Sequence, residues 1–423
     1  MSGGKVVDYN TWSKEDLIDK IRKLEIHVTQ LRNVINNKSN KPTSFETDHL
    51  DHPRKRLKLE GGDDDDTRLE NQPCSSHKKD KAKVHRKFDF STVAMRHVAL
   101  KILYLGWDYQ GLAAQEDTDE TIEAHLFKAL TMTKLIEERT KSNYHRCGRT
   151  DKGVSAFSQV ISIDLRSKTV DGQETMDYCK ILNRTLPKEI KVTAWSPVQP
   201  DFSARFNCSR RTYKYFFPKG NLNIEKMLRG ARYLVGEHDF INFCKLDKDL
   251  RSTVRKIFSV SINKSCHSAN GIDNMYDIYH LEINGASFVW HQIRCIVGIL
   301  LLVGQELEEP EVVQKLLDHC QKPQYAMAID YPLVLYDVDY PADSEVKWTY
   351  TPENMTCLLS QMQNLWVEFA IKSEMILNIV KDIENLTGTR KPSMTESLIM
   401  GTKRKNYVKI LDRPVCGNYE RLK

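Results

Sequence analysis

The chain has 423 residues, enough for two or three domains, and its 40% hydrophobic and 28% charged residues predict a folded part with some unstructured sequence. The 63 basic and 57 acidic side chains give a net charge of +6, which permits a polyanionic partner without requiring one. No apolar run is long enough to cross a bilayer and no secretory signal is present, so a soluble intracellular protein without a membrane partner is expected.

The first predicted element is a helix within residues 1–37. Ser13 and Asp16 resemble a capping box at its start. Its apolar residues recur at alternating spacings of four and three, the pattern of a heptad seam: Leu17, Ile21, Leu24, Val28, Leu31 and Ile35. About three heptads are marginal for an isolated coiled coil, so docking on the same chain and self-association both remain open.

Residues 38–89 are predicted to form a disordered charged linker. They contain few apolar side chains and no periodicity, so burial cannot offset the entropy lost on ordering. Basic clusters at 54–56 and 78–87 suit nuclear import or RNA contact, although such runs are often only solvated. We expect the protein in the nucleus and the cytoplasm.

Compact structure is expected from residue 90, in an N-terminal half (90–205) and a C-terminal half (206–423). Helices are predicted over about 120–138 and, apolar nearly all round, over 287–304. Strand-like composition or alternation predicts strands at 98–105, 159–165, 212–217 and 278–283. This mixture indicates α+β or α/β layers.

The last predicted element is a long helix that begins with Thr351-Pro352, a cap followed by proline at the first helical position. An apolar stripe continues along it to Ile383. A stripe of this length is more typical of a packing or dimer surface than of a cofactor site. The sequence after Asn385 is a basic tail.

Phosphate-binding and metal-binding patterns are incomplete. Gly148 and Gly153 have the spacing of a P-loop, but Val154 stands where the lysine that contacts phosphates would be. None of the ten cysteines forms a Cys-x-x-Cys pair, and Cys74 with His77 has no second pair to complete a zinc site. We therefore expect neither a cofactor nor a metal.

The segment 147–153 contains a candidate catalytic carboxylate, Asp151. By itself this segment is more typical of an ordinary turn, and Cys147 is more typical of a free thiol than of a nucleophile. Arg294 lies in the apolar helix predicted over 287–304, and a guanidinium buried there needs a carboxylate partner. Asp151 is a plausible partner, whose charge the arginine would maintain for catalysis. A purely structural ion pair remains the alternative.

The strand predicted within residues 210–217 interleaves aromatic and basic side chains. Alternation places Tyr213, Tyr215 and Arg211 on one face. Such a face can stack on unpaired nucleobases, but many half-buried strands have the same composition.

These segments together resemble the TruA family of tRNA pseudouridine synthases. Gly148 to Val154 is similar to the family's catalytic loop, Gly-Arg-Thr-Asp-x-Gly-Val. Phe202 to Phe206, followed by 211–215, resembles a second motif, and Phe288 to Arg294 a third. The order and spacing agree from about residue 96 to 340.

Within the family, segments 104–111, 143–147 and 332–336 are most similar to the eukaryotic branch that modifies positions 38 and 39 of the tRNA anticodon stem-loop. The long helix after Thr351 also fits this branch. Bacterial members usually have Gly-Trp where this chain has Gly111-Leu112. Catalysis should tolerate that departure because the catalytic motif is intact.

The resemblance implies an α+β fold with two halves, a mixed, mainly antiparallel sheet, helices on its faces and a central cleft. It implies a homodimer that isomerises uridine in tRNA without a metal or cofactor. The target base must be flipped out of its stack to be rotated and reattached. The implied catalytic residues are Asp151, Arg294 and Arg149, and the implied substrate-binding residues are Tyr213, Phe288 and Arg205.

Two other functions stay open. The chain could modify another tRNA position or other RNAs, or it could be an inactive RNA-binding module, although the intact Asp151, Tyr213 and Arg294 argue against the latter.

Overall fold

The computed structural model describes residues 88–170, 173–174, 176–245, 252–265, 274–318, 321–388, 393–400 and 406–416. The chain divides into two units, residues 1–83 and 84–423, and every described residue belongs to the second. The predicted N-terminal helix, the Cys74–His77 pair and nearly all of the predicted linker lie outside the described residues.

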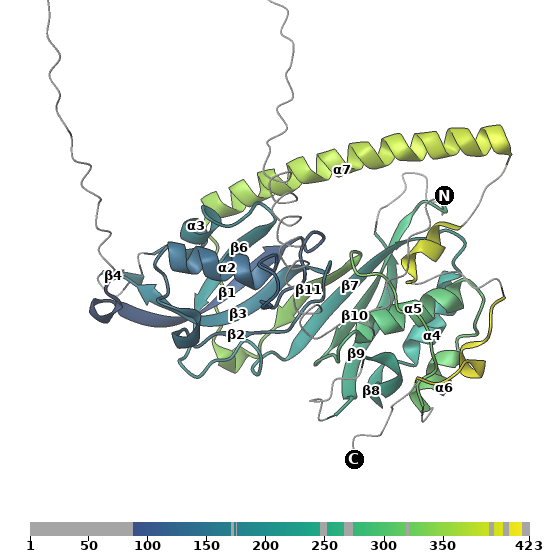
Figure 1. Cartoon of the computed structure of the whole chain (residues 1–423), viewed down its shortest axis with the longest axis horizontal. Coiled ribbons are helices and arrows are strands. Elements are labelled where there is room, and N and C mark those ends of the chain that lie inside the picture. The colour runs from purple at the N-terminus through teal and green to yellow at the C-terminus, as the bar shows by residue number, and fades with distance from the viewer. Residues whose placement is uncertain are drawn as a thin grey trace, which may run out of the picture. The chain divides into compact units, whose positions relative to one another are not determined.

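One nine-stranded sheet organises the second unit, in the order β6-β1-β3-β11-β7-β10-β9-β8, with β2 beside β3 (Figure 1). Strands β4 and β5 form a separate pair. The bounds of the strands are β1 Ala94–Tyr104, β2 His145–Arg146, β3 Ser155–Ser167, β4 Thr169–Val170, β5 Gln173–Glu174, β6 Ile190–Pro197, β7 Arg210–Pro218, β8 Gly236–Asp239, β9 Val254–Lys264, β10 Ile278–Gly285 and β11 Leu333–Asp339.

Strand β11 lies between β3 and β7 and joins the strands of residues 94–197 to those of residues 210–285. It pairs in parallel with β3, whereas the other strand pairs described are antiparallel. Leu335 is opposite Ala156 of β3 on one side and Tyr213 of β7 on the other. The start of β3, and the candidate loop just before it, are therefore brought close to Tyr213. This mixed, mainly antiparallel sheet with helices confirms the expected α+β class.

Six helices of the described residues lie beside the sheet or run past it (Figure 1). Their bounds are α2 Ile122–Met132, α3 Tyr178–Asn183, α4 Ile224–Arg232, α5 Gln292–Gly304, α6 Val312–Asp318 and α7 Pro352–Thr387. The predicted helix over 120–138 is wrong at its end. Lys134 adopts a left-handed conformation (φ 56°) just after the last turn, which ends the helix.

The apolar helix α5 begins five residues later than predicted. His291, at its N-cap, has φ 63°, and this left-handed backbone cannot continue a helix. Phe288 and Trp290 consequently lie in the connection after β10 rather than on the helix. All residues of α5 are buried, Arg294 among them, as predicted from its composition.

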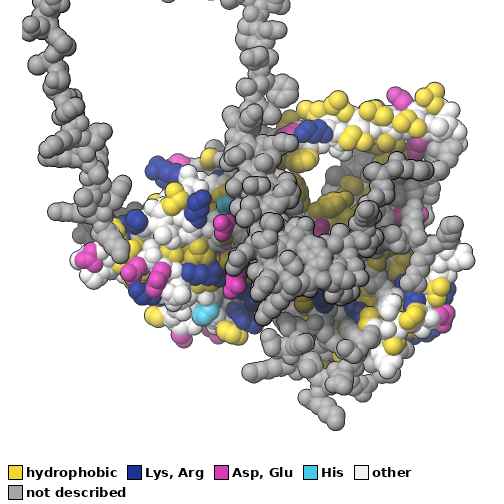
Figure 2. Space-filling view, in the orientation of Figure 1, with side chains coloured by type: hydrophobic (Ala, Val, Ile, Leu, Met, Phe, Trp, Pro, Cys, Tyr) yellow, Lys and Arg dark blue, Asp and Glu magenta, His cyan; other side chains and the backbone are white. Residues whose placement is uncertain are grey.

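Helix α7 begins after Thr351 with Pro352 in its first turn, as predicted. Leu358 is its one buried residue among those described. Figure 2 shows hydrophobic side chains along its surface, and those exposed include Leu359, Trp366, Val367, Phe369, Ile371, Met375, Ile376, Ile379, Ile383 and Leu386. Within the described part of the chain, no helix has the length and apolarity to cross a membrane.

Candidate active site

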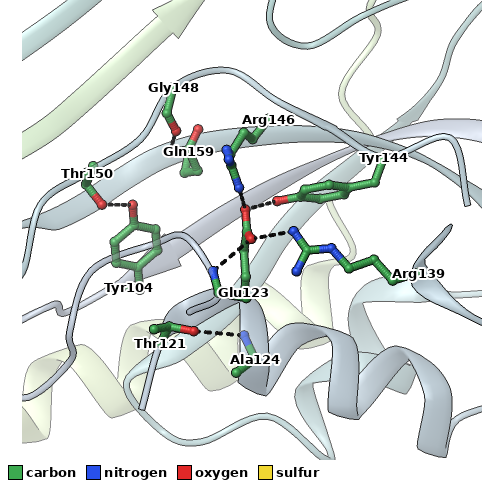
Figure 3. Close-up of polar contacts among 11 residues, drawn as sticks. Tyr104, Thr121, Glu123, Ala124, Arg139, Tyr144, Arg146, Gly148, Thr150 and Gln159 are labelled. Atoms are coloured by element: carbon green, nitrogen blue, oxygen red, sulfur yellow. Dashed lines mark hydrogen bonds and ion pairs between the residues drawn. The ribbon is translucent and has the colours of Figure 1, made fainter. Parts of the chain in front are cut away.

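The candidate loop, residues 147–153, connects β2 to β3 and is held by two hydrogen bonds from neighbouring side chains (Figure 3). The Thr150 hydroxyl hydrogen-bonds to the buried Tyr104 hydroxyl at 2.7 Å. The Gln159 amide donates to the carbonyl of Gly148 at 3.0 Å. Because these contacts fix the residues around Asp151, they position its backbone before any substrate binds.

Two glycines allow the loop to pack tightly. Gly153 has φ +77°, and a Cβ built on it would lie 2.9 Å from the Asp330 carboxylate carbon. Gly111 has φ +100°, and its Cβ would lie 3.1 Å from the carbonyl oxygen of Thr150. A larger residue at either position would combine an unfavourable backbone conformation with crowding of the loop.

Glu123, on α2, is buried and forms a charge cluster with Arg139 and Arg146 (Figure 3). Its carboxylate accepts hydrogen bonds from Arg139 Nη2 (2.9 Å) and the Tyr144 hydroxyl (2.8 Å). It also accepts from Arg146 Nη1 and from the backbone N–H of Ala114, the latter at 3.0 Å. Burial would raise the pKa of Glu123, but the hydrogen bonds and the charge of Arg146 outweigh it and lower the pKa.

Replacing Glu123 with glutamine should lower the free energy of unfolding by about 3–5 kcal/mol near neutral pH, because two arginines lose their counter-charge. A carboxylate whose folded pKa is lowered stabilises the fold above its unfolded pKa, and this contribution disappears as pH falls through the folded value. The difference between wild type and E123Q should therefore shrink below the ordinary pKa of 4.5. Urea denaturation of both proteins near neutral pH and below pH 4.5 measures this difference in the free energy of unfolding.

The matched control is Glu138→Gln, which removes the charge of an exposed glutamate paired with Lys141. Its free energy of unfolding should stay close to that of wild type. An E123Q protein as stable as E138Q at neutral pH would contradict a structural role for the buried cluster.

Asp151 lies among three side chains of the Phe288–Arg294 motif. The Trp290 indole Nε1 donates a hydrogen bond to Asp151 Oδ1 at 3.2 Å. His291 Nε2 is 3.5 Å from Oδ2, and Arg294 Nη1 is 3.8 Å from the same oxygen. Burial lowers the pKa of His291 more than the nearby Asp151 raises it, which favours a neutral imidazole. Arg294 is thus the positive charge of this cluster.

Arg294 is 4% exposed and faces two carboxylates rather than the one that the sequence suggested. Its Nη2 lies 3.9 Å from Asp330 Oδ2, in addition to the pair with Asp151. Its Nε donates to the carbonyl of Ala328 at 2.9 Å, and Nη2 contacts the Met400 sulfur at 3.1 Å. Nothing in the sequence singled out Asp330, since any acidic residue could have met the need of a buried arginine.

The loop opens on a cleft with a volume of about 1750 Å³. Among the lining side chains, all in the described part of the chain, Asp151 is the single carboxylate. Seven arginines and one lysine line the same cleft: Arg139, Arg146, Arg149, Lys152, Arg205, Arg211, Arg255 and Arg294. A cleft of this charge attracts a polyanion.

The predicted substrate-binding residues line this cleft. Tyr213 is 9% exposed, and its ring meets Phe288 edge-on at 5.2 Å between centroids. The side chains of Arg149 and Arg205 are exposed. Tyr215, in contrast, is fully buried, so the predicted stacking face of the strand reduces to Tyr213.

Arg211 has a different place from the one predicted for it. Instead of extending the stacking face, it is buried and donates to three backbone carbonyls. These belong to Cys147 (2.9 Å), Arg205 (3.2 Å) and Ala286. Arg211 therefore ties together the three segments that carry the sequence motifs.

Cys147, the alternative nucleophile, also lies at the cleft. Cys147 is buried, and its sulfur lies 3.5 Å from that of Cys208. Among the described residues, no three His, Cys, Asp or Glu side chains converge as they would around a metal ion.

Comparison with known proteins relates this chain to tRNA pseudouridine synthases. Residues 231–341 match the family model described as tRNA pseudouridine synthase. The chain is 41% identical over 411 residues to the tRNA pseudouridine(38/39) synthase of Bos taurus, covering 88% of this chain and 84% of the relative. It is 42% identical to the Homo sapiens protein of the same name (80% and 78% covered) and 36% identical to that of Saccharomyces cerevisiae (97% and 90% covered).

Proposed function

The chain belongs to the family of tRNA pseudouridine synthases, and we propose that it isomerises uridine to pseudouridine at positions 38 and 39 of the tRNA anticodon stem-loop. The charge of the cleft is the observation that carries the proposal. Among its charged lining residues, all in the described part of the chain, Asp151 is the single carboxylate and the others are cations. Cations hold the phosphates of RNA, and the carboxylate is available for the reaction. The names of the similar proteins support the two positions.

The reaction breaks the N-glycosidic bond of the target uridine, turns the uracil in place and reattaches it through carbon 5. A stacked base cannot turn, so the uridine must first leave the helix. Asp151 acts as nucleophile or base on the flipped nucleotide. The guanidinium of Arg294, 3.8 Å away, stabilises the negative charge that either role requires.

We assign roles to the other predicted site residues from their positions in the cleft. Tyr213 and Phe288 meet edge-on and form an apolar wall for the uracil ring. Arg149, exposed two residues before Asp151, fills the space that the flipped base leaves. Arg205 contacts the RNA backbone or a base at the edge of the cleft.

Mapping pseudouridine in tRNA from cells that lack the protein tests the positions. Pseudouridine should disappear at 38 and 39 and persist elsewhere in the same tRNAs, and wild-type protein, unlike an Asp151→Asn variant, should restore it. Persistence at 38 and 39 with loss at another site would instead identify a synthase for a different tRNA position or RNA. Unchanged modification everywhere would favour an inactive RNA-binding module.

The protein acts as a homodimer in this proposal, with α7 as the contact between copies. The exposed apolar side chains on α7 follow the spacing of a helix-packing stripe, and water contact along such a stripe is unfavourable. Sedimentation velocity should give a dimer for wild type and a monomer for the double variant Trp366→Glu and Ile376→Glu. Lys381→Glu, a charge change on the same helix, should remain dimeric. A dimer that survives the double variant would place the interface elsewhere.

We also propose that the protein is present in both nucleus and cytoplasm, on the basis of the basic clusters at 54–56 and 78–87.

A further inference from the structure

Phe206 is an exposed aromatic side chain at the edge of the cleft. It is 76% exposed, more than any other large hydrophobic side chain among the described residues outside α7. It also lines the cleft that contains Asp151, whereas Tyr213 in the same cleft is only 9% exposed. Single exposed apolar residues are common on protein surfaces, so exposure alone does not indicate a function. The backbone that carries Phe206 gives the additional evidence.

Residues 202–207, here called the rim loop, are fixed by hydrogen bonds. Ser203 and Asn207 bond to each other twice, from the N–H of Ser203 to the Asn207 side chain (2.8 Å) and from the N–H of Asn207 to the Ser203 carbonyl (3.0 Å). The N–H of Ala204 donates to Ser162 Oγ at 3.1 Å, and its carbonyl accepts from the Tyr340 hydroxyl at 2.9 Å. The position of Phe206 is therefore set before a ligand binds, which reduces the entropy lost on contact.

Arg211 fixes the rim loop relative to the catalytic loop. A single nitrogen, Nη2, donates to the carbonyls of both Arg205 and Cys147. These carbonyls belong to the residue just before Phe206 and to the start of the loop that carries Asp151. The exposed ring is thus attached, through one buried side chain, to the segment that presents the catalytic carboxylate.

Arg205 adds a cation to the exposed ring. Its guanidinium carbon lies 5.2 Å from the centroid of Phe206, and both side chains are exposed. An aromatic ring beside a guanidinium is the combination that proteins use to stack on unpaired bases while holding the adjacent phosphates. Packing against the protein does not account for Phe206, because 76% of the residue is exposed to solvent.

We propose that Phe206, with Arg205 beside it, is a stacking site for an unpaired nucleobase of the anticodon loop next to the flipped uridine. This inference rests on the proposed function, because it assumes that the cleft binds tRNA. A planar ring held at the edge of the cleft replaces the stacking that the neighbouring base loses when the target uridine leaves the helix. Phe206 is a binding residue in this role and takes no part in the chemical step.

Steady-state kinetics with full-length protein and tRNA separate binding from chemistry. Phe206→Ala should raise KM about tenfold or more and leave kcat within about twofold, whereas Phe206→Trp should behave like wild type. The matched control is Phe88→Ala, because Phe88 is also an exposed phenylalanine under an arginine, with the Arg166 carbon 5.0 Å from its centroid, and does not line the cleft. F88A should have the KM of wild type.

A fluorescent base detects the stack directly. An anticodon stem-loop RNA carries 2-aminopurine at one loop position at a time, and stacking on an aromatic ring quenches its emission. Wild type and F206W should quench at least one position that F206A leaves bright. A KM for F206A within twofold of wild type, or quenching that is independent of Phe206 at every position, overturns the stacking site. Absence of pseudouridine formation by the wild-type protein would instead refute the proposed function.

Discussion

Replacing Asp151 with asparagine is expected to lower kcat/KM for pseudouridine formation by at least about 10⁴-fold, with the loss in kcat. Asparagine has nearly the same shape, and its side-chain oxygen can still accept the hydrogen bond from Trp290. It lacks the negative charge that nucleophilic attack or proton abstraction requires. Single-turnover assays with saturating enzyme measure the chemical step without product release.

Binding of tRNA to the D151N protein should be as tight as to wild type or tighter. The substitution removes the single carboxylate among the described cleft-lining side chains and leaves the cations in place. A polyanion therefore meets less repulsion. A filter-binding assay on the same protein preparation distinguishes this outcome from unfolding, which would abolish binding together with activity.

Asp330 offers a matched control for Asp151. Its Oδ2 lies 3.9 Å from Arg294 Nη2, nearly the same separation as between Asp151 and that arginine. Asp330 is not among the residues that line the cleft. Asp330→Asn should consequently keep activity within about tenfold of wild type. Equal losses for D151N and D330N would indicate that both acids serve only to balance the charge of Arg294.

Much of the fold could be predicted because local periodicity determines it. The strands predicted at 159–165, 212–217 and 278–283 fall within observed strands, the one predicted at 98–105 runs one residue past the end of β1, and Thr351 marks the start of α7. The start of α5 could not be predicted, since composition does not reveal that His291 takes a left-handed backbone. The parallel pairing of β11 with β3 was also inaccessible, because it joins segments nearly 180 residues apart and depends on tertiary register.

Residue types suggested Asp151, Tyr213 and Arg294 as candidates, and the resemblance to the TruA family implied their roles. The structure places all three on one cleft. A buried arginine in a sequence indicates only that its guanidinium needs hydrogen-bond acceptors, not which residues supply them. For Arg294 these include carboxylates, whereas Arg211 uses backbone carbonyls, which every residue possesses and no sequence pattern marks. The buried cluster around Glu123 could not be predicted for a similar reason, since its partners lie elsewhere along the chain, at Ala114 and within residues 139–146.

Arg294 should be needed for both the chemical step and stability, and substitution is expected to separate the two. Arg294→Met leaves Asp151 and Asp330 without their shared cation and the carbonyl of Ala328 without its donor. The single-turnover rate should fall by about 10²–10³-fold, and the free energy of unfolding by about 3 kcal/mol. Arg294→Lys keeps the charge but not the planar fork, so it should recover stability better than rate.

Adding Asp330→Asn to Arg294→Met distinguishes a structural ion pair from a catalytic one. Asp330 without its cation is an uncompensated charge, and neutralising it should recover part of the lost stability. The rate should stay low, because Asp151 still lacks the guanidinium that lies 3.8 Å from it in wild type. Urea denaturation and single-turnover assays on the four proteins of this cycle give both quantities. If the double variant recovered rate together with stability, Arg294 would act on the fold alone, and the negative charge of Asp151 would have to be stabilised by its hydrogen bond from Trp290 and by His291.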